Sequence, residues 1–249
     1  MELEKIVEIL EEIAPSDLAE DFDKGRIGLI LNLEKNVNKI AVSLDANAYT
    51  LKKAAEMGAD LLISHHTLIF HPVTQISKPL AVSLKLALDN EISLYSMHTN
   101  YDNANGGIND ALAVRLGLRN VEKAGMGRIG EIEPCSSAEL ATRVSKCLKT
   151  PVMYAGDQTE LKRVMVMGGS CFREEYLEIA RFHRVDAFVS SELKHDILRS
   201  FEDLCLIDAT HYATENPGME ALCPRLRELL GLEVVFIEQP SGLKAINWI

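Results

Sequence analysis

The sequence lacks the cysteine pattern of a disulfide-stabilised protein or of a thiolate metal site. Its five cysteines stand at scattered positions, and no two of them form a C-x-x-C pair. An odd number at irregular spacing argues against a disulfide framework and against a cysteine-rich zinc site. We therefore expect these residues to behave as small apolar side chains in or near the hydrophobic cores. They are Cys135, Cys147, Cys171, Cys205 and Cys223.

Long apolar runs and an excess of positive charge are absent as well. No run approaches the roughly 18 residues that a bilayer crossing needs, and the acidic N-terminal stretch does not have the plan of a signal peptide. We expect a cytoplasmic protein with no membrane partner. The net charge is −11, and no dense basic stripe offsets it. Because an acidic protein gains little from counterion release on DNA or RNA, the composition argues against a nucleic-acid partner.

The chain instead contains strand-like apolar runs that alternate with helical patterns. In the first half, apolar runs at 40–44, 61–64 and 92–97 are separated by helical periodicity at 50–57 and 79–90. This β-α-β-α-β order is typical of a largely parallel, buried sheet.

A similar order recurs after residue 160. The segment 39–45 (KIAVSLD) can be laid beside 163–169 (RVMVMGG), and 59–66 (ADLLISHH) beside 185–192 (VDAFVSSE). The shared order and spacing favour an internal duplication, although any alternating α/β chain can be aligned with itself. We predict an α/β protein with two similar domains, each with a mostly parallel sheet flanked by helices in α/β/α layers.

The glycine-rich stretch 125–130 (GMGRIG) interrupts this pattern and indicates a boundary near residues 120–130. It matches G-x-G-x-x-G, but it lacks the strand before it and the helix after it that a dinucleotide-binding loop requires. We therefore expect no dinucleotide cofactor. The predicted first domain comprises 1–122 plus 208–249 and carries most of the metal ligands proposed below, and the second domain comprises 123–207.

Histidines follow three of the expected strands. His65 and His66 directly follow one strand, His98 directly follows a second, and His211 follows a third. In open parallel sheets, ligands bind beyond the carboxyl ends of the strands. Carboxylates stand nearby in the chain, because an acidic residue lies four positions after His98 and another four positions after His211. The predicted metal ligands are His65, His66, Asp102, His211 and Glu215.

Each of these positions also has a structural interpretation. The histidine pair could bind loop carbonyls, and an Asp in a loop is often a turn former. His211 and Glu215 share one face if they lie on a helix. A helix that begins near Thr214 would accommodate Pro217 in its first turn and would leave His211 just before it. His71 and His183 are expected to be structural.

Three imidazoles and two carboxylates without a thiolate suit zinc, iron, manganese, cobalt or nickel. Five ligands exceed the need of one tetrahedral zinc ion, whereas two divalent ions about 3.5–4 Å apart would use all of them. Two dications bring four positive charges against two carboxylates. The remaining charge calls for hydroxide or an anionic substrate group, and phosphate makes a nucleotide-like substrate the working hypothesis.

Other polar groups are candidates for a supporting role. His98 could orient a metal ligand or stabilise its loop. Glu192 and His195 follow the strand at 187–190 and could support the metal ligands or exchange protons, while Glu192 could equally cap a helix. Gly168-Gly169-Ser170 is either a tight strand-to-helix turn or a place of close backbone approach. The sequence assigns no catalytic residue.

Several motifs occur here in the same order as in one protein family. They are LLISHHTLIF, HTNYDNANGGIND, GMGRIG, VMVMGGS, SSELKH and HYATE. The chain resembles, over nearly its whole length, the NGG-one-interacting-factor-three-like proteins, often named GTP cyclohydrolase I type II homologues. The resemblance implies two similar α/β domains, a dinuclear metal centre in the cleft between them, and a homohexamer. The family's ligand positions fall on the five residues already named. The stretch 23–29 departs from the family pattern, and Thr67 stands where proline is usual.

The family name implies hydrolytic opening of the GTP imidazole ring, in which metal-bound hydroxide attacks C8 and formate leaves. The first functional hypothesis is therefore a metal-dependent hydrolase acting on a nucleotide or another phosphate-bearing molecule. The alternative is a non-catalytic, metal-bearing hexameric scaffold or regulatory interaction protein. A hydrolase with a non-phosphate substrate, such as an amide, is a third hypothesis.

Overall fold

The computed structural model describes residues 1–244, and their contacts divide the chain into two compact units. Unit 1 comprises Met1–Gly107 and Met219–Pro240, and unit 2 comprises Ile108–Gly218 and the C-terminal residues from Ser241. The domain boundaries expected at 122/123 and 207/208 remain a prediction, because a grouping by contacts does not test which segment folds alone. Over the described residues, none of the helices combines the length and the apolar character that a membrane crossing needs.

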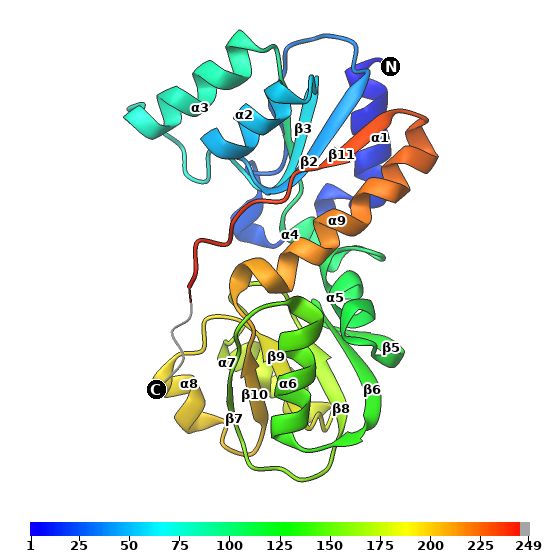
Figure 1. The fold of residues 1–249 in the computed structure, drawn as a ribbon, viewed down its shortest axis with the longest axis vertical. Helices are drawn as coiled ribbons and strands as arrows, with labels where there is room; N and C mark the ends of the chain where they lie inside the picture. Colours follow the sequence, from blue (N-terminus) through cyan, green and yellow to red (C-terminus); the bar gives the residue numbers. More distant parts are fainter. Residues whose placement is uncertain (245–249) are drawn as a thin grey trace. The chain divides into compact units, whose positions relative to one another are not determined.

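Unit 1 is built on a five-stranded sheet in the order β1-β4-β3-β2-β11. The four strands β4, β3, β2 and β11 run parallel, and β1 is antiparallel to β4 at the edge. Helices α2 and α3 cover one face of the sheet, and α1 lies on the other (Figure 1). The strands are β1 (Gly28–Leu31), β2 (Lys39–Asp45), β3 (Leu61–His66), β4 (Ser93–Ser96) and β11 (Glu233–Phe236). The helices are α1 (Leu3–Ile13), α2 (Ala48–Glu56), α3 (Lys78–Asp89) and α4 (Thr99–Asn103).

Unit 2 is built on a six-stranded sheet in the order β5-β6-β8-β9-β10-β7. Its centre, β8-β9-β10, is parallel, and the other pairs are antiparallel. The strands are β5 (Arg119–Ala124), β6 (Gly127–Cys135), β7 (Met153–Ala155), β8 (Leu161–Val166), β9 (Ala187–Ser190) and β10 (Cys205–Asp208). The helices are α5 (Ile108–Leu116), α6 (Ser137–Leu148), α7 (Glu174–Phe182) and α8 (His195–Ser200), together with the start of α9 (His211–Leu230), which belongs to unit 1 from Met219 on.

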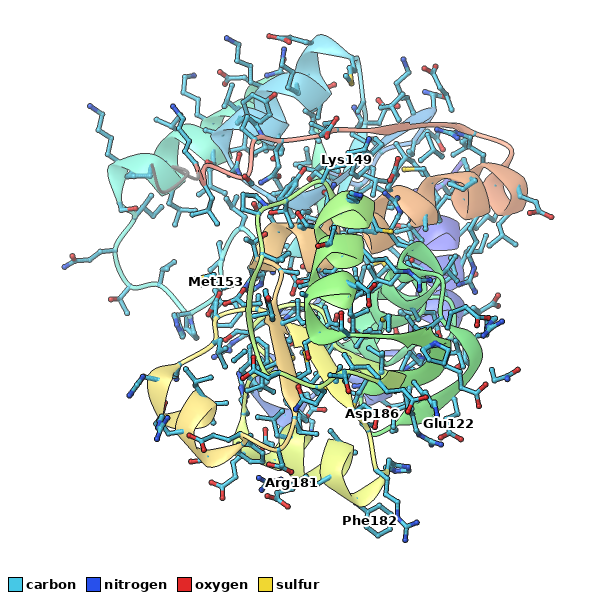
Figure 2. The ribbon with its side chains drawn as sticks, turned by 60° about the horizontal axis from the view of Figure 1, so that its bottom comes forward. Glu122, Lys149, Met153, Arg181, Phe182 and Asp186 are labelled. Atoms are coloured by element: carbon cyan, nitrogen blue, oxygen red, sulfur yellow. The ribbon has the colours of Figure 1, made fainter. Side chains whose placement is uncertain are left out.

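Two separate hydrophobic clusters hold the helices of unit 2 to the sheet. One joins α5 and α6 to alternate residues of β8, β9 and β10, and the other joins α7 to the residues between them. This alternation follows from the period of two in a strand, which places successive side chains on opposite faces. Phe182, the last residue of α7, is 83% exposed and points outward in Figure 2.

The central strands of the two units begin with the same hydrogen-bond arrangement. In unit 1, Oδ2 of Asp60 accepts bonds from the backbone amides of Asn38 and Lys39 at 2.8 and 3.1 Å. In unit 2, Oδ2 of Asp186 accepts bonds from the amides of Lys162 and Arg163 at 2.7 and 2.8 Å. Each aspartate stands just before the strand that pairs in parallel with the first one. The segments that the sequence aligns are thus equivalent in hydrogen bonding.

The predicted α/β class is confirmed, and both sheets are mixed rather than uniformly parallel. The antiparallel edge strands are short or mostly exposed. The strand β1 (GLIL) has only a short apolar run and is partly buried, β5 is mostly exposed, and β7 has three residues. The GMGRIG stretch forms the turn from β5 into β6 and continues along β6. A strand, β5, does precede the stretch, contrary to the sequence interpretation, and a strand rather than a helix follows it.

The structure corrects the expected start of the helix that carries Glu215. Helix α9 begins at His211, not near Thr214, and Pro217 therefore lies in its second turn. The Oγ1 of Thr214 donates to main-chain carbonyls of the first turn, at 3.1 Å to Thr210 and 2.9 Å to His211. These bonds stabilise a turn that the sequence pattern alone did not place in the helix.

Candidate metal centre

Three imidazole rings gather at the carboxyl ends of β3 and β4 in unit 1. His65 and His66 are the last two residues of β3, and His98 follows β4. One ring nitrogen of each lies within 4.8 Å of those of the other two. The sequence placed both histidines just after the strand, but β3 continues through both of them, with His66 opposite Asp45. The ring centroids of His65 and His66 nevertheless lie 5.0 Å apart.

In each of these histidines, Nδ1 lies against an oxygen of the chain. Nδ1 of His65 lies 2.9 Å from the carbonyl oxygen of Met97. Because a carbonyl only accepts, this nitrogen donates, and the lone pair of the neutral ring is on Nε2. Nδ1 of His66 lies 2.5 Å from Oδ1 of Asp45, and Nδ1 of His98 lies 2.8 Å from Oδ2 of Asp23. This arrangement is typical of metal-binding histidines, whose second nitrogen donates to an oxygen that fixes the ring.

Asp102 lies in the short helix α4, beside His65. Its Oδ1 is 3.6 Å from Nε2 of His65, and the residue is buried. Oδ2 of Asp23 receives hydrogen bonds from the amide and the hydroxyl of Thr99, and so fixes the start of α4. Burial acts to raise the pKa of Asp23, but the hydrogen bonds from His98 and Thr99 outweigh it and hold the pKa below its usual range. Asp23 is therefore an ionised, buried acceptor.

Asp45, the partner of His66, is itself held from the C-terminal side of unit 1. Gln239 follows β11, and its side-chain amide donates to Oδ2 of Asp45 while its carbonyl accepts from the Asp45 amide. Gln239 is almost fully buried. The carboxylate of Asp45 thus has one oxygen for His66 and one for Gln239, which fixes its orientation.

Unit 2 contributes a second pair of candidate ligands. His211 and Glu215 lie one turn apart at the start of α9, with Nε2 of the histidine 3.1 Å from Oε2 of the glutamate. Nδ1 of His211 lies 2.7 Å from Oε1 of Glu192. The hydrogen bond with His211 is the largest influence on Glu192 and lowers the pKa of that carboxyl. The backbone of Glu192 has a φ of 63°, a left-handed conformation that is unfavourable for a glutamate.

The glycines after β8 approach this pair closely. Gly169 has a φ of +73°, and a Cβ at this position would collide with Oε1 of Glu215 and lie 3.3 Å from Nε2 of His211. Oγ1 of Thr214 accepts a bond from the Gly169 amide at 3.0 Å, and Oδ1 of Asn109 accepts one from the Gly168 amide at 2.7 Å. The sequence left a tight turn and a close approach open, and the structure has both.

Taken one unit at a time, the five predicted ligands form two sets. His65, His66 and Asp102 lie together in unit 1, and His211 and Glu215 lie together in unit 2. The structure adds the ring of His98 to the first set, although the sequence gave His98 only a supporting role. His195 lies at the exposed start of α8 and belongs to neither set. Glu192, for which the sequence left a supporting role and a helix cap open, lies against Nδ1 of His211.

Sequence reasoning missed Asp23, Asp45 and Gln239. Asp45 ends strand β2 next to β3, so the rule that located the histidines could have found it. Asp23 lies in the irregular stretch before β1, and Gln239 lies after the last strand. The sequence marks Asp23 and Gln239 only as polar residues, and polar residues are common in loops.

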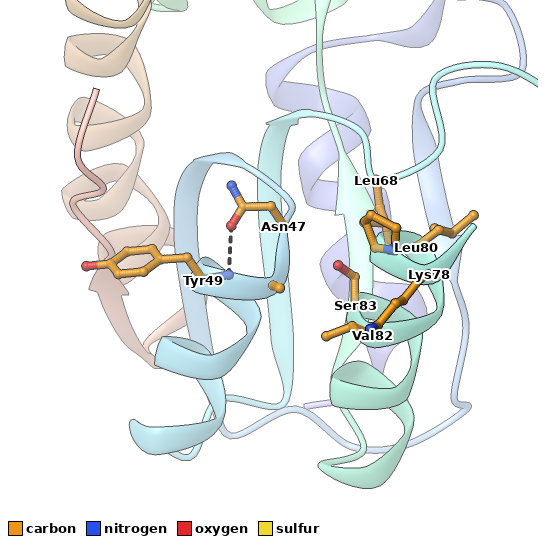
Figure 3. A pocket seen from close by; sticks show the side chains of 9 residues that line it. Asn47, Tyr49, Leu68, Lys78, Leu80, Val82 and Ser83 are labelled. Carbon is orange, nitrogen blue, oxygen red and sulfur yellow. Dashed lines mark hydrogen bonds between the residues drawn. The ribbon is translucent and has the colours of Figure 1, made fainter. Parts of the chain in front are cut away.

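The donor set fits a divalent ion, because it offers imidazole nitrogens and carboxylate oxygens with their supporting acceptors in place. A pocket elsewhere in unit 1 does not fit a divalent ion. This pocket of about 630 Å³ lies at the starts of α2 and α3, and its side chains include Tyr49, Leu80 and Val82 (Figure 3). Its lining contains no histidine, cysteine or carboxylate.

The model of the family described as Duf34/NIF3 (NGG1p interacting factor 3) matches residues 1–241. The chain belongs to the Duf34/NIF3 family. Among the family's relatives, a Pyrococcus abyssi protein named GTP cyclohydrolase 1 type 2 homolog is 33% identical, covering 98% of this chain and all of that one. A structure of reduced HcgD from Methanocaldococcus jannaschii is 30% identical with a TM-score of 0.83, covering 96% of this chain and 98% of that one. A Bacillus cereus protein related to NIF3 has a TM-score of 0.92 at 19% identity over 99% of both chains, which shows the shared fold alone.

Proposed function

We propose that this protein is a metal-dependent hydrolase acting on a nucleotide or another phosphate-bearing substrate. One observation supports this most strongly. His65, His66 and His98 have ring nitrogens within 4.8 Å of one another, and the Nδ1 of each ring lies against a fixed oxygen. Histidines that serve only as core residues do not need three such arrangements at one edge of a sheet.

We further propose that His65, His66, Asp102, His211 and Glu215 together hold two divalent ions. Zinc, iron, manganese, cobalt and nickel all suit this mixture of imidazole and carboxylate. Two ions bring four positive charges against the two ligand carboxylates. A phosphate-bearing substrate would balance the excess, which favours a nucleotide over a neutral amide.

Divalent ions in such a centre lower the pKa of water towards neutrality and hold substrate oxygens. The chain's own residues would orient this chemistry. Asp45, Asp23 and Glu192 fix the rings of His66, His98 and His211 by accepting from Nδ1. The relatives' name, GTP cyclohydrolase 1 type 2 homolog, supports hydrolytic opening of a purine imidazole ring as the reaction.

The decisive experiment is elemental analysis, with anomalous scattering, on protein purified without chelators. We expect two divalent ions per chain. The metal-loaded protein is then screened for turnover of nucleotides. We expect His66→Ala and Asp102→Ala to lose metal and to abolish turnover, and the exposed His71→Ala to change neither.

Two results would contradict the proposal in different ways. Protein without bound metal would remove the chemistry altogether. Protein with two ions per chain that turns over no nucleotide would favour the alternative, a metal-bearing scaffold or regulatory protein.

A further inference from the structure

The stretch before β1 is attached directly to the histidine cluster. Asp23 is fully buried and accepts from His98 and from Thr99. Its neighbours Phe22 and Lys24 are exposed. The amide of Arg26 donates to the Asp23 carbonyl at 2.8 Å, which closes the turn. The loop 21–26 therefore presents its side chains beside His98, although this stretch is where the sequence departs from the family pattern.

Two exposed phenylalanines stand against the ring of His98. Phe22 is 45% exposed, and its centroid lies 6.3 Å from that of His98 in an edge-on arrangement. Phe70, on the loop that follows β3, is 40% exposed and lies 6.1 Å from the same ring, also edge-on. A fold that needed only a core would bury these rings, because each exposed phenylalanine forfeits a large apolar burial.

A guanidinium completes the group. Cζ of Arg26 lies 4.4 Å from the centroid of the Phe70 ring. A guanidinium above an aromatic ring can still donate its N–H groups to another partner. Lys24 differs, because its ammonium pairs with Asp21 at 2.6 Å. Within residues 1–244, no carboxylate forms an ion pair with Arg26.

We propose that Phe22, Phe70 and Arg26 form a binding platform for a flat heteroaromatic ring that carries a phosphate. The exposed ring of Phe22 provides a stacking surface for the base, and Arg26, over the ring of Phe70, provides a two-pronged donor for the phosphate. Contact with His98 places this platform at the histidine cluster. The inference rests on the proposed function and deepens it, because it assigns nucleotide recognition to named residues.

The platform is tested by calorimetric titration of the full-length, metal-loaded protein with guanosine 5′-monophosphate, guanosine and ribose 5-phosphate. The variants are Phe22→Leu and Arg26→Ala. Tyr49→Leu, which removes an equally exposed ring from α2, and Lys24→Ala, which removes a charge from the same loop, are the matched controls. Metal content is measured for every protein.

We expect each platform variant to weaken binding of the monophosphate about tenfold, the size of effect that one base stack or one charge-assisted contact produces. Phe22→Leu should weaken guanosine binding and leave ribose 5-phosphate unchanged, and Arg26→Ala should do the reverse. The two controls should bind all three ligands as the wild type does.

Wild-type affinity for the monophosphate in both variants would overturn the platform, as would an absence of monophosphate binding by the wild type. The result is separable from the proposed function. A protein with two ions and nucleotide turnover that is insensitive to both substitutions retains the hydrolase and loses the platform. Failure to bind metal refutes the hydrolase. The same ligand titrations, carried out on the metal-free protein, then test the platform alone.

Discussion

At the scale of single residues, the orientation of each candidate histidine ligand depends on Nδ1, the ring nitrogen that would not bind the metal. Asp45, Asp23 and Glu192 each accept from an Nδ1, and each is itself positioned by its neighbours or its backbone. Ring orientation is thereby fixed before an ion arrives. Such partners typically change metal affinity by about 10- to 100-fold.

The substitution Asp45→Asn tests this role. An amide can still accept from Nδ1 of His66, but it lacks the charge that makes the bond strong. We expect metal affinity to fall about tenfold, measured at neutral pH by competition with a chelating indicator. The matched control is Asp89→Asn, which removes an exposed carboxylate of α3 that pairs with Lys85. Equal affinity in the two variants would show that Asp45 has no such role.

Gly169 allows a clean separation of backbone strain from steric conflict. Gly169→Ala places a methyl group in a left-handed conformation and against Oε1 of Glu215. Gly231, which has a φ of +64° and open space around it, is the matched site, because an alanine there meets the strain alone. We expect Gly231→Ala to lower the free energy of unfolding by about 1 kcal/mol and to leave metal binding intact.

For Gly169→Ala we expect a larger loss of stability, by about a further 1 kcal/mol, together with reduced metal content. Denaturant unfolding and elemental analysis measure the two effects. If Gly169→Ala kept the metal content of the wild type, the close approach would have no importance for the site.

At the scale of elements, the sequence allowed prediction of the parts that have a strong period or a strong end signal. The central strands β2, β3, β8 and β9 appear as apolar runs, because strands buried on both faces need apolar residues throughout. The histidine positions followed from the ends of these runs. Edge strands such as β1 and β7 are short and only partly buried or exposed, so their few apolar residues give a weaker signal. The start of α9 depends on hydroxyl contacts of Thr214, and contacts of this kind leave no periodic trace.

The aspartates that begin β3 and β9 lead to a prediction for stability. Burial acts to raise the pKa of Asp60, but the amides of Asn38 and Lys39 and the ammonium of Lys35 outweigh it, so the pKa lies below its usual range. The ionised group therefore stabilises the fold above the pKa of the unfolded chain, and this contribution is lost as the pH falls towards the folded pKa.

We expect Asp60→Asn to lower the free energy of unfolding by about 1–2 kcal/mol at pH 7, the size of hydrogen bonds to a charged group. The difference from the wild type should begin to shrink below about pH 4, where the unfolded chain takes up a proton that the folded carboxylate does not, and it should disappear once the pH is below the folded pKa. Urea unfolding across this pH range measures it. A difference that stays constant down to pH 2 would contradict the assignment to the ionised form.

At the scale of the whole molecule, we propose that the chain assembles as a homohexamer, as its resemblance to the family implies. The expected mass in solution is about six times the 27.6 kDa of one chain, measured by light scattering after size exclusion. His66→Ala should retain this mass if the assembly does not depend on the metal. A monomeric wild type at micromolar concentration would refute the hexamer.

The position of β11 has a consequence for biosynthesis. This strand pairs with β2, although it leaves the ribosome almost 200 residues later. Until then the β2 edge has no partner from β11, while the main segment of unit 2, Ile108–Gly218, has already been translated. Gln239 emerges later still, and it is the residue that orients Asp45 towards His66. A nascent chain that carries every predicted metal ligand therefore still lacks the last support of His66, and the support is complete only after Gln239 has been translated.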